Sequence, residues 1–245
     1  MPTLEWNHSY WGKDYVWSEG GDEWSKTWGG SEAQWFGSLF PRLHRMLPAR
    51  RILEIAPGRG RWTQYLIPMC SAFIGVDIAE SCVIECTNRF AGAPHAGFIH
   101  NDGLSLAAVP DNSFEFIFSF DSLVHAELDV MQSYIPQLVK KLAPGGKAFL
   151  HHSNYAACDH GGKRSEHARA GSVSGEIIAS LVKQSGGQML VSEFINWGSI
   201  QTTDCLSTFT RDDDQAPEHL LLTNPRFMEE AHIILDFQSP YSTVP

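Results

Sequence analysis

The sequence lacks the features that mark several classes of protein. Its 245 residues hold 18 lysines and arginines against 28 aspartates and glutamates, and the net charge of −10 argues against nucleic acid or an anionic membrane as the main partner. No stretch approaches the roughly 18 uninterrupted apolar residues of a membrane-spanning helix, and the N-terminus has no basic segment followed by an apolar run. We therefore expect a cytoplasmic protein with neither nucleic acid nor membrane as a partner.

Cysteine is scarce and shows no pairing pattern. The five cysteines are an odd number, and their positions do not follow the spacing of a zinc finger. This favours reduced thiols, as in a cytosolic protein, over a disulfide framework.

From Arg51 onward, short apolar runs alternate with segments of helical periodicity, which is typical of βαβ units and a parallel sheet. The expected strands cover residues 52–56, 72–77, 97–100, 114–120, 147–152, 189–196 and 205–210. The expected helices cover 32–47, 62–70, 79–90, 128–142 and 174–185. The pattern predicts an α/β fold, a Rossmann-like, doubly wound sheet of seven strands over residues 49–245, whose last two strands form a hairpin.

The first 30 residues carry an unusual density of aromatic side chains. Five tryptophans and two tyrosines occur there among glycine, serine and acidic residues, with neither helical nor strand periodicity. We expect an irregular, aromatic-rich arm that caps the domain. Ser31 and Gln34 form a capping-box pattern, which predicts the start of the helix at 32–47. The arm and this helix make up residues 1–48.

A glycine turn follows the first expected strand. Gly58 and Gly60 lie between that strand and a helix, where glycine lets the backbone approach a ligand closely. The third glycine of the dinucleotide fingerprint is replaced by Thr63, and no Tyr-x-x-x-Lys motif is present, which argues against a nicotinamide enzyme. Asp77 ends the second expected strand, where a carboxylate can bind the ribose diol or cap the next helix.

With these motifs, residues 50–210 resemble the class I S-adenosylmethionine-dependent methyltransferases. The likeness rests on Glu54-x-x-x-Gly58-x-Gly60, Asp77, Asn101-Asp102-Gly103 and the Leu-Ala-Pro-Gly-Gly-Lys run at 142–147. The chain departs from many members at Ala56-Pro57, where they carry Gly-Cys. The resemblance implies S-adenosylmethionine as cofactor. It implies a cofactor site made of Glu54, Gly58, Gly60, Asp77, Ile78, Asp102, Gly103 and Phe120.

A candidate catalytic segment follows the fourth expected strand, at the sheet edge where such folds bind ligands. Its Ser-x-Asp-x-x-x-His pattern, with Asp121 and His125, resembles that of phosphoethanolamine methyltransferases, whose histidine pairs with an N-terminal tyrosine. Histidine, with an ordinary pKa near ~6.5, suits a general base that takes a hydroxyl proton. We expect His125 to be catalytic with Asp121 beside it, and either Tyr10 or Tyr15 to supply the tyrosine; a His125 that only caps or packs a helix is the alternative.

The whole chain is similar to bacterial sugar O-methyltransferases of the methylmannose polysaccharide type. The likeness rests on the segments that begin at Trp28, Phe120, His151 and Asn196. It implies methyl transfer to a hydroxyl of a saccharide, and indole faces suit the C–H face of a pyranose. The expected substrate-binding residues are Tyr10, Tyr15, Trp28, His152 and Asp204. The alternatives are a methyltransferase of a small non-sugar metabolite, such as a phosphobase or natural product, and a non-catalytic nucleotide-binding module.

A divalent cation is a further expectation. If Asp121, His152 and Asp204 converge at the sheet edge, they offer ligands for Mg²⁺, as in some sugar O-methyltransferases, although histidine is an unusual ligand for this ion. Ordinary hydrogen-bonding roles for the three side chains are the alternative. The sequence leaves open whether the chain forms a homo-oligomer.

Overall fold

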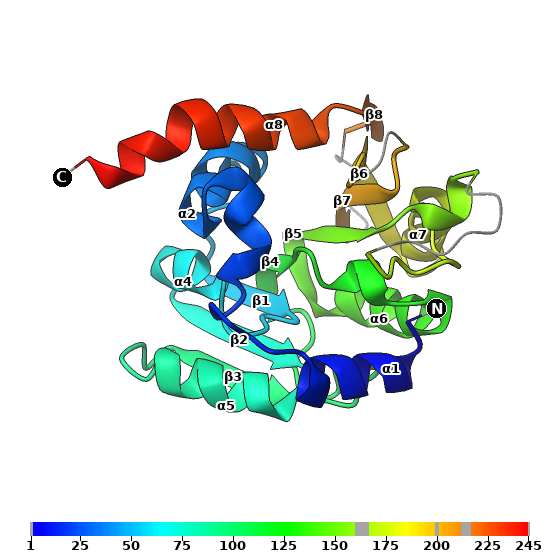
Figure 1. Cartoon of the computed structure of the whole chain (residues 1–245). Helices are drawn as coiled ribbons and strands as arrows, with labels where there is room; N and C mark the ends of the chain where they lie inside the picture. Colours follow the sequence, from blue (N-terminus) through cyan, green and yellow to red (C-terminus); the bar gives the residue numbers. More distant parts are fainter. Residues whose placement is uncertain (1, 160–166, 199–200, 212–216, 245) are drawn as a thin grey trace.

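A single mixed β-sheet organises the computed structural model, which describes residues 2–159, 167–198, 201–211 and 217–244 (Figure 1). Over these residues the sheet has eight strands in the order β3-β2-β1-β4-β5-β7-β6-β8. The strands are β1 (Arg51–Ile55), β2 (Ala72–Asp77), β3 (Ala96–His100), β4 (Phe114–Ser119), β5 (Leu142–Ser153), β6 (Gly187–Ile195), β7 (Asp204–Arg211) and β8 (Leu220–Asn224). The Rossmann-like α/β architecture is confirmed, and the expected count of seven strands is one too low.

The two faces of the sheet bury different side chains and carry different helices. Along β1, Leu53 belongs to a core shared with α6 (Leu128–Lys141) and α7 (Gly175–Gln184), whereas its neighbour Ile52 belongs to a second core. Because successive side chains of a strand point to opposite faces, helices on both sides are needed to bury such a strand. This is the doubly wound arrangement.

A helical segment near the N-terminus supplies much of the second core. It runs through α2 (Ser31–Gln34), the π-helical η3 (Trp35–Leu39) and α3 (Phe40–Leu43), and it lies beside α8 (Phe227–Ile233) (Figure 1). Trp35 and Leu39 are fully buried there. The segment ends at Leu43, four residues before the expected end of the helix.

The start of that helix differs from the capping-box prediction. Ser31 is the first helical residue, and its backbone N–H donates to Oδ1 of Asp22 at 3.0 Å. The Ser31 hydroxyl lies 3.0 Å from the hydroxyl of Tyr65. A carboxylate from the preceding arm therefore caps the helix, a contact nine residues away that the capping-box pattern does not cover.

The aromatic arm is helical in most of its length, so the expectation of an irregular arm is wrong. It contains α1 (Leu4–Ser9), the π-helical η1 (Tyr10–Asp14) and the 3-10 helix η2 (Asp22–Trp28). Trp6, Tyr10, Trp11 and Tyr15 contact one another at ring distances of 4.6–6.4 Å. Each helix is too short to display a 3.6-residue period, which is why the sequence gave no helical signal.

The eighth strand had no sequence signal either. β8 pairs in parallel with β6 at the edge of the sheet, beyond the antiparallel hairpin of β6 and β7 that was expected. Its three leucines, Leu220, Leu221 and Leu222, are all exposed. A strand without an apolar and a polar face shows no alternation, so only its pairing with β6 identifies it.

Short elements complete the described chain. They are α4 (Thr63–Leu66), η4 (Ile67–Met69), α5 (Glu80–Arg89), η5 (Leu123–His125), η6 (Tyr155–Ala157), η7 (Ile234–Gln238) and η8 (Ser239–Thr243). Among the helices of the described residues, none has the length and apolar character needed to span a membrane.

Candidate functional site

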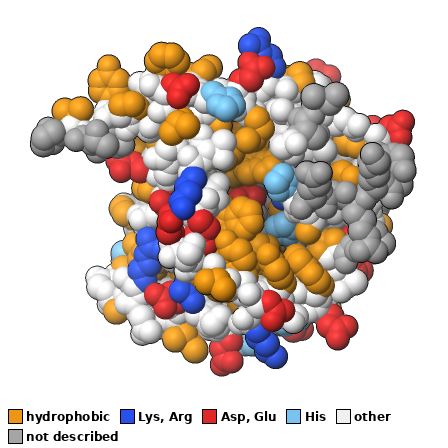
Figure 2. Space-filling model, viewed as in Figure 1, with side chains coloured by type: hydrophobic (Ala, Val, Ile, Leu, Met, Phe, Trp, Pro, Cys, Tyr) orange, Lys and Arg blue, Asp and Glu red, His pale blue; other side chains and the backbone are white. Residues whose placement is uncertain are grey.

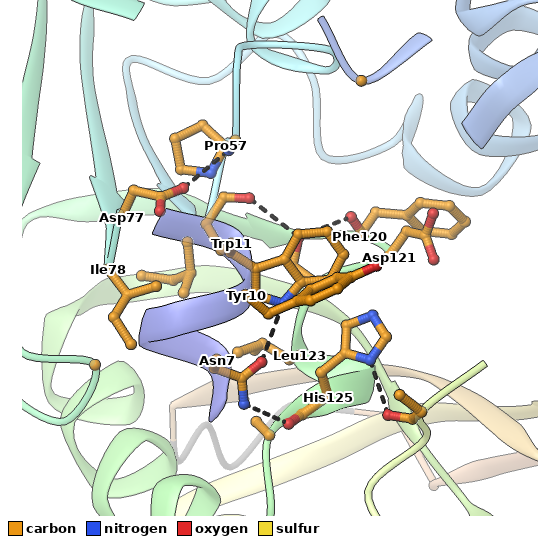
Figure 3. A pocket seen from close by; sticks show the side chains of 18 of the residues that line it. Asn7, Tyr10, Trp11, Pro57, Asp77, Ile78, Phe120, Asp121, Leu123 and His125 are labelled. Atoms are coloured by element: carbon orange, nitrogen blue, oxygen red, sulfur yellow. Dashed lines mark hydrogen bonds between the residues drawn. The ribbon is translucent and has the colours of Figure 1, made fainter. Parts of the chain in front are cut away.

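A cavity of about 300 Å³ lies at the carboxyl ends of β1, β2 and β4, and the N-terminal arm forms one of its walls. Figure 2 shows hydrophobic side chains gathered in the middle of this face, with histidines beside them. Figure 3 shows Asp77 and Ile78 on one side of the cavity and Asp121 and His125 on the other. We call these sides the cofactor end and the acceptor end. Of the residues predicted from sequence, the cavity is lined by Tyr10, Gly58, Asp77, Ile78, Gly103, Phe120, Asp121 and His125.

The glycine turn after β1 is held against Asp77. Gly58 has φ +57°, a left-handed conformation that favours glycine, and its N–H donates to Oδ2 of Asp77 at 2.9 Å. A Cβ on Gly58 would lie 2.8 Å from the Trp17 ring, which covers the turn. Gly60 does not line the cavity; a Cβ there would lie 2.5 Å from the Phe90 ring. Gly58 therefore borders the ligand space, whereas Gly60 permits the turn to pack.

Glu54 stands behind the turn and not in the cavity. It is 1% exposed, and its Oε2 accepts a hydrogen bond of 2.6 Å from the Thr63 hydroxyl. Burial raises the pKa of the Glu54 carboxyl to about 8. Thr63, which replaces the third glycine of the dinucleotide fingerprint, thus has a partner of its own. The predicted direct contact of Glu54 with the cofactor gives way to a supporting role.

Asp77 is aimed at the cofactor end of the cavity. Its Oδ1 accepts from the N–H of Ala79 at 2.8 Å and its Oδ2 accepts from Gly58, so each oxygen keeps a further lone pair. The carboxylate is 4% exposed, and this burial raises its pKa to about 6. It can accept hydrogen bonds from a diol such as that of ribose.

The turn after β3 closes this end of the cavity. Gly103 has φ +75°, and a Cβ on it would lie 2.6 Å from Ile78 and 2.7 Å from Leu4 of the arm. Asp102 is exposed and accepts from the N–H groups of Leu104 and Ser105, which lowers its pKa. Asp102 therefore shapes the turn and does not line the cavity, contrary to its predicted cofactor contact.

His125 is presented to the acceptor end by η5. Its Nδ1 lies 2.9 Å from the carbonyl oxygen of Ala168. Because a carbonyl only accepts, Nδ1 carries the proton, and Nε2 keeps the lone pair that a base needs. The ring is 8% exposed and lies near Trp6 and Trp11. Burial, with the nearby charge of Arg169, lowers the pKa of His125 to about 4, so the imidazole is neutral at physiological pH.

Hydrogen bonds join the N-terminal arm to His125. Asn7 of α1 donates from Nδ2 to the His125 carbonyl at 2.9 Å, and the indole N–H of Trp11 donates to Oδ1 of Asn7 at 3.1 Å (Figure 3). Tyr10 lines the cavity and stacks on Trp6, with ring centroids 4.6 Å apart. The aromatic wall of the cavity and the candidate base are therefore held together.

Tyr10, and not Tyr15, is the tyrosine at the cavity. The Tyr15 hydroxyl donates to Glu23 at 2.9 Å, and burial together with this bond raises its pKa. Its ring packs on the arm aromatics Trp17 and Trp24. Tyr15 therefore joins the arm's aromatic cluster, and its predicted place in the substrate site passes to Tyr10.

Asp121 has a left-handed backbone at the end of β4. Its φ of +60° is unusual for a residue with a side chain, and Ala56, which follows the neighbouring strand β1, has φ +56°. Such strain, of about 1–3 kcal/mol per residue, is typical of ligand sites. The Ser122 hydroxyl donates to the Ala56 carbonyl at 3.1 Å and links the two segments. The Asp121 carboxylate pairs with Arg61 at 2.9 Å.

Besides Tyr15, three of the predicted substrate residues lie away from the cavity. Trp28 is 1% exposed and packs on Trp197, so it belongs to the core. His152 is fully buried between the Ser207 hydroxyl and the Ser153 carbonyl, and burial lowers its pKa to about 4. Asp204 is fully buried as well. On the strand β5, alternation turns His152 to the face opposite His151.

The predicted magnesium ligands are not brought together. Among the described residues, no group of three His, Cys, Asp or Glu side chains is placed to hold a metal ion. Asp121 pairs with Arg61, and Asp204 pairs with Arg169 at 2.8 Å. These donors already have cationic partners, so the residues present do not fit Mg²⁺.

Three arginines at the cavity were not predicted. Arg61 directly follows Gly60 in the glycine turn and lines the cavity. The sequence did not predict its ion pair with Asp121. Arg169 lines the acceptor end from a segment without a motif. A third, Arg59, lines the cavity, and its buried Nε has no hydrogen-bond partner among the described residues. Arg59 thus has a nitrogen left for a ligand.

Comparison with known proteins agrees with this fold. Residues 52–146 match the protein family described as "Methyltransferase domain". No curated protein matches the chain in sequence.

Solved structures share the fold at low sequence identity. The N-methyltransferase NodS from Bradyrhizobium japonicum WM9, in complex with S-adenosylhomocysteine, is 18% identical with a TM-score of 0.57, over 86% of this chain and 97% of that chain. The 1,6-didemethyltoxoflavin-N1-methyltransferase from Burkholderia thailandensis, with bound 1,6-didemethyltoxoflavin and S-adenosylhomocysteine, is 18% identical with a TM-score of 0.59, over 80% of this chain and 84% of that chain. The [4+2]-cyclase SpnF is 15% identical with a TM-score of 0.57, over 72% and 80%.

Residues 52–146 match a methyltransferase family, and the two methyltransferase structures named above hold S-adenosylhomocysteine, the demethylated form of S-adenosylmethionine. The cofactor end suits this molecule: a left-handed glycine turn, a carboxylate with free lone pairs and the unpaired nitrogen of Arg59 meet there. These neighbours are named for different reactions, so they do not identify the acceptor of this chain, which must be inferred from its own residues.

Proposed function

We propose that the chain transfers a methyl group from S-adenosylmethionine to a hydroxyl of a saccharide. The observation that carries the proposal is His125, a neutral imidazole whose Nε2 lone pair is available at a cavity walled by indoles. Bound S-adenosylmethionine supplies an electrophilic methyl group on a sulfonium. A sugar hydroxyl is a weak acid, so its attack gains from a positioned base.

At the cofactor end, the chain's own residues bind and orient. Asp77 would accept the two ribose hydroxyls with its remaining lone pairs, and Ile78 and Gly103 would border the adenine. Gly58 would let the backbone approach the methionine portion, whose carboxylate the guanidinium of Arg59 would bind. The arm residue Trp17 covers the turn and excludes water from it.

At the acceptor end, His125 takes the hydroxyl proton on Nε2. The paired Asp121 and Arg61 offer acceptors and donors side by side, which suits neighbouring hydroxyls. Trp6, Tyr10 and Trp11 provide flat apolar faces for the C–H side of a pyranose. We also propose that residues 1–48 act as a cap on the catalytic domain of residues 49–245.

The acceptor end favours a neutral acceptor over a phosphobase. Binding a phosphate would require a cation free of other partners, but Arg61 is paired with Asp121 and Arg169 with Asp204. Arg59 belongs to the glycine turn at the cofactor end. A saccharide is therefore preferred, and a neutral natural product remains the second candidate.

The test is incubation of the protein with methyl-labelled cofactor and a panel of mono- and oligosaccharides, phenols and phosphobases, read by mass spectrometry. Label on a saccharide that disappears with His125→Gln is the expected result. Label only on a phenol or an amine would overturn the saccharide assignment. Tight cofactor binding without transfer to any acceptor would favour a nucleotide-binding module.

A further inference from the structure

A buried acid lies directly behind the acceptor end, although it does not line the cavity. Asp204 begins β7 and is fully buried. Its Oδ2 lies 2.9 Å from Nε2 of His151, and both its oxygens lie 3.0 Å from Nε of Arg169. Although burial opposes ionisation, the charge of Arg169 and the hydrogen bond to His151 lower the pKa of Asp204 to about 2. Asp204 is thus a carboxylate with two separate partners.

The first partner leads to Asp121. Nδ1 of His151 accepts the backbone N–H of Asp121 at 3.1 Å, so this nitrogen carries no proton. The proton of His151 is then on Nε2, where it is donated to Asp204. Asp204 selects the tautomer that can hold Asp121 in its left-handed conformation. The His151 ring is also fixed by Phe120, with centroids 4.6 Å apart.

The second partner leads to His125. Arg169 directly follows Ala168, whose carbonyl accepts the Nδ1 proton of His125. Ala168 has φ +49°, and the N–H of Ala170, the residue after Arg169, donates to the Val124 carbonyl at 2.9 Å. By holding Arg169, Asp204 places the carbonyl that determines which nitrogen of His125 is protonated.

We infer that Asp204 is a positioning residue, which through His151 and Arg169 sets the acid and the base at the acceptor end. Asp121 and His125 come from one segment after β4, but their orientation is fixed from β7, about eighty residues later. One buried carboxylate thereby couples the two groups that meet the acceptor. Only the kinetic part of this inference rests on the proposed function.

Histidine tautomers provide a test that does not depend on activity. In ¹⁵N-histidine-labelled protein near neutral pH, NMR of native protein should show His125 protonated on Nδ1 and His151 on Nε2. His125→Gln and His151→Phe identify the two signals by their loss. Asp204→Asn should convert both rings to a mixture of tautomers. Unchanged tautomers in this variant would overturn the inference.

If Asp204→Asn does not fold, variants that change only one of the two partners of Asp204 still test the inference. Arg169→Lys keeps the positive charge but removes the forked guanidinium group. The His125 ring should then become a mixture of tautomers, while His151 stays protonated on Nε2. His151→Phe keeps the aromatic contact with Phe120, and His125 should stay unchanged. If His151→Phe changed the His125 tautomer and Arg169→Lys did not, or if both variants changed it, the inference that Asp204 acts through two separate partners would be contradicted.

A matched control is available in a second buried pair. Glu193 is 8% exposed and binds Arg42 at 2.8 Å, away from the cavity. Glu193→Gln should leave both tautomers and turnover unchanged, which separates positioning from the general loss of a buried ion pair. A change of tautomers in Glu193→Gln as large as in Asp204→Asn would overturn the inference.

The kinetic test compares turnover with cofactor binding. With a saccharide acceptor identified as above, Asp204→Asn should lower kcat about 10- to 100-fold, since displacement of a reacting group by an ångström has effects of that size. Calorimetric affinity for S-adenosylhomocysteine should remain native, which also reports that the protein is folded. Native kcat would overturn the inference and leave the proposed function standing. Altered tautomers in a protein that methylates no saccharide would leave the inference standing and overturn the function.

Discussion

The two ends of the cavity are built in different ways. At the cofactor end, Asp77 is the last residue of β2, and Gly58 and Gly103 lie in the turns after β1 and β3, so each was visible as a local motif. At the acceptor end, Asp121 and His125 depend on the arm, on β5 and on the segment at 167–170. Binding of the cofactor is therefore encoded locally, whereas orientation of the acceptor groups depends on contacts between distant segments.

Substitution of the candidate base, His125, should separate the functions of the two ends most clearly. His125→Ala should lower kcat by ~10²–10⁴-fold, because proton removal by a positioned base typically contributes that much. Affinity for the cofactor, measured by calorimetry, should be unchanged. The exposed His44 offers a control, and His44→Ala should retain native turnover. Loss of cofactor binding in His125→Ala would show that the two ends are not separable.

Trp28 tests the limit of the aromatic wall. Because it is 1% exposed and packed in the core, Trp28→Ala should reduce the free energy of unfolding by about 3–5 kcal/mol. Chemical denaturation measures this loss. The KM for the acceptor should stay native in the folded fraction, and a raised KM with unchanged stability would return Trp28 to the substrate site.

Asp77→Ala should act on the cofactor end alone. Loss of a carboxylate that accepts two ribose hydroxyls should weaken cofactor affinity at least about tenfold, from about 1.5–3 kcal/mol per lost charged hydrogen bond. Turnover at saturating cofactor should change far less. Glu54→Gln is the comparison, since Glu54 contacts Thr63 and lines no ligand space. Equal affinities in the native protein and Asp77→Ala would remove Asp77 from the cofactor site.

The two ends should also respond to pH separately. Burial raises the pKa of Asp77 to about 6, so its ionised form is lost, and cofactor affinity falls, as pH drops through about 6. His125 has a lowered pKa of about 4, so its neutral form persists until pH drops through about 4. The kcat at saturating cofactor should therefore stay flat between pH 7 and 5. A loss of kcat near pH 6 would show that the base titrates with its ordinary pKa.

Chelation should have the smallest effect. The donors Asp121 and Asp204 are paired with arginines, and His152 is turned to the other face of the sheet. Activity should be unchanged by EDTA and by added Mg²⁺. Collapse with EDTA and recovery with Mg²⁺ would mean that the acceptor end rearranges around a cation.

Elements that depend on neighbouring residues could be predicted from the sequence, whereas contacts between residues far apart in the chain could not. Strands with apolar runs and turns with glycine could be predicted because each needs only neighbouring residues. β8 and the helical arm were missed, since their leucines and aromatics show no period within such short elements. For the same reason, Trp28 and Tyr10 looked alike in the sequence, although one is buried in the core and the other lines the cavity.

The sequence by itself determined the order of the strands from β1 to β7 and of the main helices between them, the glycine turn and the positions of Asp77 and His125. Periodicity and backbone conformation express these directly. Only the tertiary structure decided which buried groups have partners. His151 and His152 are neighbours, yet one contacts Asp121 and the other Ser207, because a strand sends successive side chains to opposite faces. The pairing of Asp204 with Arg169, and hence its loss as a metal ligand, arises where β7 meets a segment 35 residues away.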